Sequence, residues 1–154
     1  MLEYDQTMTL QCPRDATALE TVRDHAIEID RCPACRGAWY DYDELAELEH
    51  SVASDEYTLG TVEYAKHTSE LRCPVDGAAM VAFNYRAYNL ELDTCAEEHG
   101  FWLDGGESER VLEIMRERVR GLRRAQSSQK AWNRARGRDT SPGVIDQIRN
   151  FFRL

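Results

Sequence analysis

The fold is decided by residues 29–44, which read IDRCPACRGAWYDYDE. Within this stretch Cys32 and Cys35 form a Cys-x-x-Cys pair. Residues 12–15, CPRD, place a third cysteine 20 residues upstream of Cys32. Thiolates on two short turns at this spacing are typical of structural zinc sites. The pattern therefore predicts a zinc-binding unit with two metal-binding turns, which we call knuckles.

A similar pattern recurs further along the chain. Residues 73–76 read CPVD, and residues 92–107 read LDTCAEEHGFWLDGGE. The separation of cysteine and tryptophan, Cys32 to Trp39 and Cys95 to Trp102, is seven residues in both stretches. We interpret the two as a tandem duplication of a unit of about 40 residues. A unit this small needs a cross-link besides its apolar core. A bound metal ion is the cross-link that reduced thiols can form.

Short strands and helices are predicted around the knuckles. Strand-like alternation occurs at residues 21–30, 80–85 and 90–92. The spacings Asp41-x-x-Glu44 and Asp104-x-x-Glu107 indicate helix starts, in which the aspartate accepts hydrogen bonds from first-turn amides. Each unit is therefore expected to be a zinc ribbon, with a β-hairpin between two knuckles and a short helix after them.

These patterns predict a small α+β fold with two tandem zinc-ribbon units, a long basic helix and a short C-terminal amphipathic helix. Its segments are a first zinc-ribbon unit with its helix at 1–50, a connector at 51–70, a second zinc-ribbon unit at 71–113, an arginine-rich helix at 114–140 and the amphipathic C-terminal helix at 141–154. The connector has no Gly/Ser tract, so we expect the two units to pack together.

The repeated stretches resemble the transcription factor IIB type zinc-ribbon family of small bacterial and archaeal proteins. The motifs that carry the resemblance are Cys-Pro at 12–13, Ile-Asp-x-Cys-Pro-x-Cys at 29–35, Gly-x-Trp-x-Asp at 37–41 and Glu-Leu at 44–45, with looser counterparts at 73–74 and 93–107. The resemblance covers residues 10–50 and 71–113. It implies the ribbon fold and bound zinc, and the family's name implies transcription. We interpret Trp39 and Trp102 as packing residues that cover the knuckles.

Two zinc ions per chain are expected, one in each unit. The predicted ligands are Cys12, Asp15, Cys32 and Cys35 for site one, and Cys73, Asp76, Cys95 and His99 for site two. Aspartate oxygen and imidazole nitrogen are both established zinc donors.

Where a site has a residue other than cysteine, the sequence leaves an alternative assignment open. Asp15 and Asp76 occur where an Asx turn would use their side chains for backbone hydrogen bonds. His25 competes for the fourth place of site one, and Glu98 competes with His99 in site two.

Charge is divided along the chain. Residues 1–114 hold 25 acidic and eight basic side chains, a balance of −17, whereas residues 115–154 hold three acidic and 11 basic, a balance of +8. Such a division favours either self-association or a basic segment for an acidic partner. The residues assigned to nucleic-acid or anionic-partner binding are Arg116, Arg120, Arg123, Arg124, Lys130, Trp132, Arg134, Arg136 and Arg138.

The C-terminus carries an apolar stripe. Its members recur at helical spacing: Val144, Ile145, Ile148, Phe151 and Phe152. Such a stripe would dock on the ribbons, on a second chain, or in the groove of a protein partner.

The function expected from the sequence is that of a non-enzymatic zinc-binding adaptor. It would contact proteins through the acidic ribbons and the C-terminal helix, and the alternative is a transcription- or ribosome-related factor that binds DNA or RNA through the arginine-rich helix. The chain has no Gly-rich phosphate loop, His-Glu-x-x-His motif or nucleophile elbow. It also lacks an apolar run of about 20 residues and a signal-peptide pattern, so we expect a cytoplasmic location and no membrane partner.

The first prediction concerns metal content. Elemental analysis of protein purified without chelator should find two zinc ions per chain, because the sequence offers two sets of four donors. A single ion would contradict the assignment of a metal site to the second unit.

Overall fold

The computed structural model describes residues 9–53 and 63–139. The chain divides into two compact units, Met1–Arg116 and Glu117–Leu154, here called the N-terminal and C-terminal units. The apolar stripe predicted between Val144 and Phe152 lies outside the described residues.

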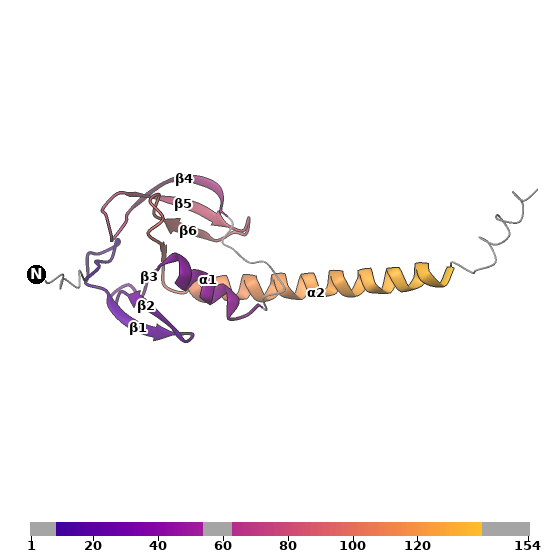
Figure 1. The fold of residues 1–154 in the computed structure, drawn as a ribbon. Coiled ribbons are helices and arrows are strands. Elements are labelled where there is room, and N and C mark those ends of the chain that lie inside the picture. Colours follow the sequence, from indigo (N-terminus) through magenta and orange to yellow (C-terminus); the bar gives the residue numbers. More distant parts are fainter. Residues whose placement is uncertain (1–8, 54–62, 140–154) are drawn as a thin grey trace, which may run out of the picture. The chain divides into compact units, whose positions relative to one another are not determined.

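The N-terminal unit is built on one antiparallel sheet of seven strands in the order β1-β2-β3-β7-β6-β5-β4. Figure 1 labels β1 to β6 of these strands. The strands are β1 (Glu20–Asp24), β2 (Ile27–Arg31), β3 (Ala38–Tyr40), β4 (Glu63–Arg72), β5 (Ala79–Tyr85), β6 (Glu91–Thr94) and β7 (Phe101–Leu103). The hairpins predicted from residues 21–30 and 80–92 are confirmed as β1–β2 and β5–β6.

Local chemistry explains the first hairpin. Ile27 and Ile29 are buried while Glu28 between them is exposed, which is the alternation of a strand with one covered face. The two turn residues, His25 and Ala26, have φ angles of 50° and 68°. A two-residue turn with positive φ at both positions matches the right-handed twist of the flanking strands.

The two halves of the sheet meet at β3 and β7. Trp39 is paired with Trp102, with Ala38 opposite Leu103 on one side. Every residue of both strands is buried. Residues 11–50 and residues 71–113 therefore contribute strands to one shared sheet.

Strand β4 is an element that the sequence analysis missed. It lies at the end of the predicted connector and pairs with β5, with register shifts between Tyr64 and His67 and between Thr68 and Arg72. Most of its residues are exposed, so its sequence lacks the alternation that marks a half-buried strand.

Helix α1 (Tyr42–His50) begins with the predicted capping box. The Glu44 N–H donates to Asp41 Oδ1 at 2.7 Å, and the Asp41 N–H donates to Glu44 Oε2 at 2.7 Å. Leu45 and Leu48 are buried beneath the helix. The apolar face predicted for this helix is confirmed.

Helix α2 (Glu107–Asp139) begins differently. The Asp104 N–H donates to Glu107 Oε2 at 2.7 Å, as a capping box requires. The Asp104 carboxylate, however, accepts from Trp102 Nε1 at 2.9 Å and from Arg14 Nε and Nη2 at 2.9 and 2.6 Å. The prediction that Asp104 caps first-turn amides is wrong, because the helix begins at Glu107, three residues later, and the Asp104 carboxylate instead accepts from Trp102 and Arg14.

A buried cluster of three polar side chains also joins the two halves of the sheet. The Tyr85 hydroxyl on β5 donates to the Glu49 carboxylate on α1, and Arg86 Nε donates to the same hydroxyl at 3.2 Å. Arg86 Nη2 lies 3.6 Å from Glu49 Oε1. A buried charge is tolerated only when it is paired in this way.

The raised pKa of Glu107 predicts how stability depends on pH. Burial raises this pKa from 4.5 to about 7, although the hydrogen bond from Asp104 acts in the opposite direction. The folded chain therefore keeps a proton that the unfolded chain releases, and the free energy of unfolding falls between about pH 4.5 and 7.

Glu107→Gln keeps an acceptor for the Asp104 N–H and removes the titration. We expect this variant to lose less stability than the wild type between about pH 5 and about pH 8, measured by urea unfolding. Glu117→Gln, at an exposed position of the same helix, is the control. A wild-type pH profile for Glu107→Gln would contradict this account.

Candidate metal centres and basic helix

The structure brings the four predicted residues of site one together. One ligand atom from each of Cys12, Asp15, Cys32 and Cys35 lies within 4.8 Å of all the others. Cys12 Sγ and Cys35 Sγ are 3.6 Å apart, and both Asp15 oxygens are 3.6 Å from Cys32 Sγ.

Both knuckles of site one point backbone amides at sulfur. The N–H groups of Arg14, Cys35 and Gly37 lie 3.4 Å from the Sγ atoms of Cys12, Cys32 and Cys35, respectively. Each knuckle is closed by a residue in the left-handed region, Ala16 at φ 60° and Arg36 at φ 64°. Amides that donate to sulfur stabilise the thiolate form, which is the form that binds metal.

Site two is assembled in the same way. One ligand atom from each of Cys73, Asp76, Cys95 and His99 lies within 4.8 Å of all the others. His99 Nδ1 is 3.4 Å from Cys95 Sγ, 3.8 Å from Cys73 Sγ and 3.3 Å from Asp76 Oδ2. The imidazole therefore reaches the place that the second thiol of the Cys-x-x-Cys pair takes in site one.

Both aspartates form the predicted Asx turns and also lie beside the thiols. Asp15 Oδ1 accepts from the Thr17 N–H at 2.9 Å, and Asp76 Oδ1 accepts from the Ala78 N–H at 2.9 Å, as in Asx turns. These backbone hydrogen bonds are the largest cause of the lowered pKa of both carboxyl groups. The turns thus hold each carboxylate ionised and beside the thiols.

The two competing ligands lie outside these groups. His25 occupies the β1–β2 turn, where its Nδ1 is 3.0 Å from Asp24 Oδ1. Glu98 is exposed in the knuckle beside His99, with a φ of 60°. Neither residue belongs to the two groups that the structure assembles among the described residues.

Burial sets the protonation of the thiols. It raises the pKa of Cys12 and of Cys73 to about 12 each, so without a cation both thiols stay protonated at neutral pH. For Cys32, burial acts in the same direction, but the amides of Cys35 and Ala34 hold its pKa below the ordinary value. Metal binding must therefore release protons, which makes affinity depend on pH.

The donor chemistry of both groups fits zinc. Site one offers three sulfurs and one carboxylate oxygen, and site two offers two sulfurs, one nitrogen and one oxygen. Four such donors satisfy the tetrahedral shell of a structural zinc ion, and soft thiolates disfavour magnesium and calcium.

The predicted basic residues lie on helix α2. The described members separate into two faces of the helix. Five of them recur at separations of four, three, seven and four residues and share one face, here called the cationic stripe: Arg116, Arg120, Arg123, Lys130 and Arg134.

All five side chains of the cationic stripe are exposed. Arg124 is also exposed and lies beside the stripe. Within residues 9–53 and 63–139, no acidic side chain forms an ion pair with the five cations. The stripe is therefore an exposed row of cations without an acidic partner among the described residues.

Trp132 lies on the opposite side of the helix. It is 60% exposed, and Arg136 Cζ lies 5.8 Å from the centre of its ring. Arg118 shares this side and is partly buried, while the Arg138 side chain is outside the described residues. The single binding set predicted from the sequence is thus divided between two helix faces.

Two glycines with a structural role were missed. A Cβ atom on Gly37 would overlap Cζ2 of Trp102, and one on Gly100 would lie 2.3 Å from the Tyr40 carbonyl oxygen and 2.9 Å from Cζ2 of Trp39. The signal was present in the sequence, since each glycine precedes a tryptophan by two residues in both copies.

Comparison with known proteins supports part of this picture. The family model described as "Transcription factor zinc-finger" matches residues 11–50, about a quarter of the chain. No curated protein and no solved structure matches. Residues 11–50 are thus a zinc-binding ribbon domain, and no described helix is long and apolar enough to cross a membrane.

Asp15→Asn distinguishes a zinc-ligand role of Asp15 from a role in the turn alone. Asparagine keeps the oxygen that accepts from Thr17 but loses the charge that a zinc ligand supplies. We expect zinc affinity at site one to fall by about tenfold or more, measured by competition with a chromophoric chelator. Asp43→Asn, at an exposed position of α1, is the control. Unchanged affinity would assign Asp15 to the turn alone.

Proposed function

We propose that the protein is a non-enzymatic zinc-binding adaptor with two structural zinc ions, whose basic helix contacts nucleic acid. The single observation that carries this proposal is the cationic stripe on α2. The ribbon match at residues 11–50 supports it, because such ribbons are common in nucleic-acid-associated factors.

The two-zinc part of the proposal treats residues 71–113 as a second ribbon. Like those of Cys12 and Cys32, the carbonyls of Cys73 and Cys95 each accept a returning backbone N–H at 2.8–3.1 Å, although the donor follows Cys95 by three residues and the other cysteines by four. Four protein donors per site leave no open position for water or substrate, which is typical of structural zinc. The ions would hold the sheet together and take no part in chemistry.

Nucleic acid is the partner that best fits the stripe. Four of its five members are arginine, whose planar guanidinium binds phosphate in a bidentate manner. From Arg116 to Arg134 the stripe extends over about 27 Å of helix, so it can follow a row of phosphates.

The N-terminal unit supplies the other end of the adaptor. Asp41, at the N-cap of α1, and Asp43 and Glu47 within the helix are exposed, and no described basic residue forms an ion pair with them. Glu28 and Asp30 help to raise the pKa of Glu44 to about 7, after burial as the largest cause, so these acids form one patch. A basic protein surface is the partner we propose for it.

A cytoplasmic location follows from the same proposal. The five cysteines are free, and five unpaired thiols in the two proposed zinc sites need a reducing compartment.

The nucleic-acid contact is tested with two charge-matched double variants. Arg120→Gln/Arg134→Gln removes two charges from the cationic stripe, and Arg118→Gln/Arg136→Gln removes two from the opposite side. Binding to a mixed pool of DNA and RNA oligonucleotides is measured across salt. The stripe variant should lower the slope of log affinity against log salt by about 2, and the control by less.

Two outcomes would contradict the contact. If the wild type fails to bind the pool at low salt, the helix does not serve nucleic acid. If both double variants lose affinity equally, the effect is one of net charge and the stripe has no special role. Oligomerisation that is lost in the stripe variant would show that the acidic patch of a second copy is the partner.

A further inference from the structure

Each of the two tryptophans at the centre of the sheet places its ring against the other half of the sheet. Trp39 and Trp102 are direct partners across the β3–β7 pair, and their exposures are 4% and 0%. The ring of Trp102 lies where a Cβ of Gly37 would be, and the ring of Trp39 lies 2.9 Å from the corresponding position on Gly100. Each indole therefore covers the knuckle glycine of the other half.

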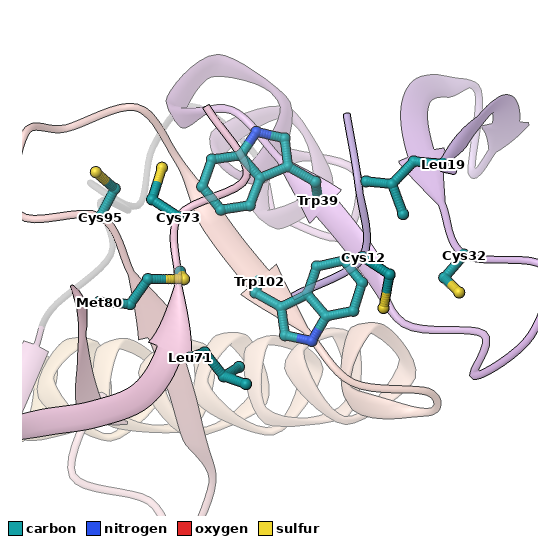
Figure 2. Packing of buried hydrophobic residues seen from close by; sticks show 9 residues of the cluster. All are labelled: Cys12, Leu19, Cys32, Trp39, Leu71, Cys73, Met80, Cys95 and Trp102. Carbon is teal, nitrogen blue, oxygen red and sulfur yellow. The ribbon is translucent and has the colours of Figure 1, made fainter. Parts of the chain in front are cut away.

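Figure 2 shows the same arrangement at the thiols. Trp102 is drawn on the side of Cys12, and Trp39 on the side of Cys73 and Cys95. All five residues belong to one buried cluster.

The glycines connect the indoles to the metal ligands. The Gly37 N–H lies 3.4 Å from Cys35 Sγ, and the Gly37 carbonyl accepts from the Cys32 N–H at 2.8 Å. In site two the Gly100 carbonyl accepts from the Cys95 N–H at 3.0 Å. A ring that fixes the glycine therefore fixes the second knuckle of the site.

We propose that Trp102 is a positioning residue for site one and Trp39 for site two, so that each half orders the metal knuckle of the other. The inference rests on the proposed pair of metal sites. Its physical basis is pre-organisation: a knuckle held in its bound geometry loses less conformational entropy when the metal binds. Residues that orient ligands without touching the metal change affinity by about 10–100-fold.

A merely structural role for the indoles predicts something different. Removing either ring leaves a cavity in the shared cluster and weakens the whole sheet. That effect lowers the affinity of both sites together. Positioning by the tryptophan of the other half instead predicts that each variant loses metal affinity mainly at one site, and that this site differs between the two variants.

The experiment uses the full chain loaded with Co²⁺ as the probe. Absorption from cobalt–thiolate bonds is stronger at site one, with three thiolates, than at site two, with two. Chelator competition then gives one affinity for each site. Trp102→Leu should weaken site one about tenfold more than site two, and Trp39→Leu should do the reverse. Trp132→Leu, which changes an exposed indole, should alter neither site.

A second variant keeps the inference testable if the leucine variants fail to fold. Gly37→Ala forces the Trp102 ring away without removing it, and it should weaken site one selectively. In a Trp102→Phe background the same change should cost less affinity, because the smaller ring leaves room for the methyl group.

Equal losses at both sites, or a greater loss at the site in the variant's own half, would overturn the inference. The metal count of the wild type tests the proposed function separately. If the chain binds one ion at site one only, the second site is wrong, while Trp102→Leu and Trp39→Leu can still be compared at site one. There, a greater loss in Trp39→Leu would overturn the inference.

Discussion

The pairing of β3 with β7 is the interaction on which the N-terminal unit depends. Each strand has only three residues, and every one of them is buried. A strand this short gains little from its own hairpin, so its burial requires the other half of the sheet. Full burial of one large apolar side chain contributes about 1.5–3 kcal/mol relative to exposure. Separating the halves would therefore expose two fully buried strands and leave both knuckle glycines uncovered.

Polar contacts across the same seam follow from that arrangement. Arg14, in the first knuckle, reaches Asp104, which also accepts from Trp102 Nε1. Glu49 on α1 meets Tyr85 and Arg86 beside β5. A buried polar group stabilises only the geometry that satisfies it, and an apolar seam alone would tolerate sliding. These contacts therefore fix the register in which the two halves meet.

The sequence predicted the local features of this fold and missed the non-local ones. The knuckles, the first hairpin and the capping box at Asp41 are each encoded within a few residues, and all were found. Strand β4 was missed because its side chains are mostly exposed and carry no alternation. The placement of Trp39 and Trp102 against the opposite halves was missed because a tryptophan beside a knuckle is naturally assigned to its own knuckle. Only the pairing of distant strands shows which knuckle each ring covers. The two ligand groups were predicted because their spacing repeats, and the structure assembles both.

Helix α2 carries its five stripe cations on one face, although folding of the helix does not require that placement. Its first turns bury Val111, Ile114 and Met115, so the costly nucleation step is supported by packing in the N-terminal unit. From residue 123 to residue 137 every described side chain is exposed, and alanine, arginine, lysine and glutamine, all strong helix formers, make up most of the segment. A helix sustained by intrinsic propensity is indifferent to which of its exposed faces carries charge. Five cations on one face raise their mutual repulsion, which slightly destabilises the isolated helix. An arrangement that folding does not need and that electrostatics opposes is the observation on which the proposed nucleic-acid contact rests.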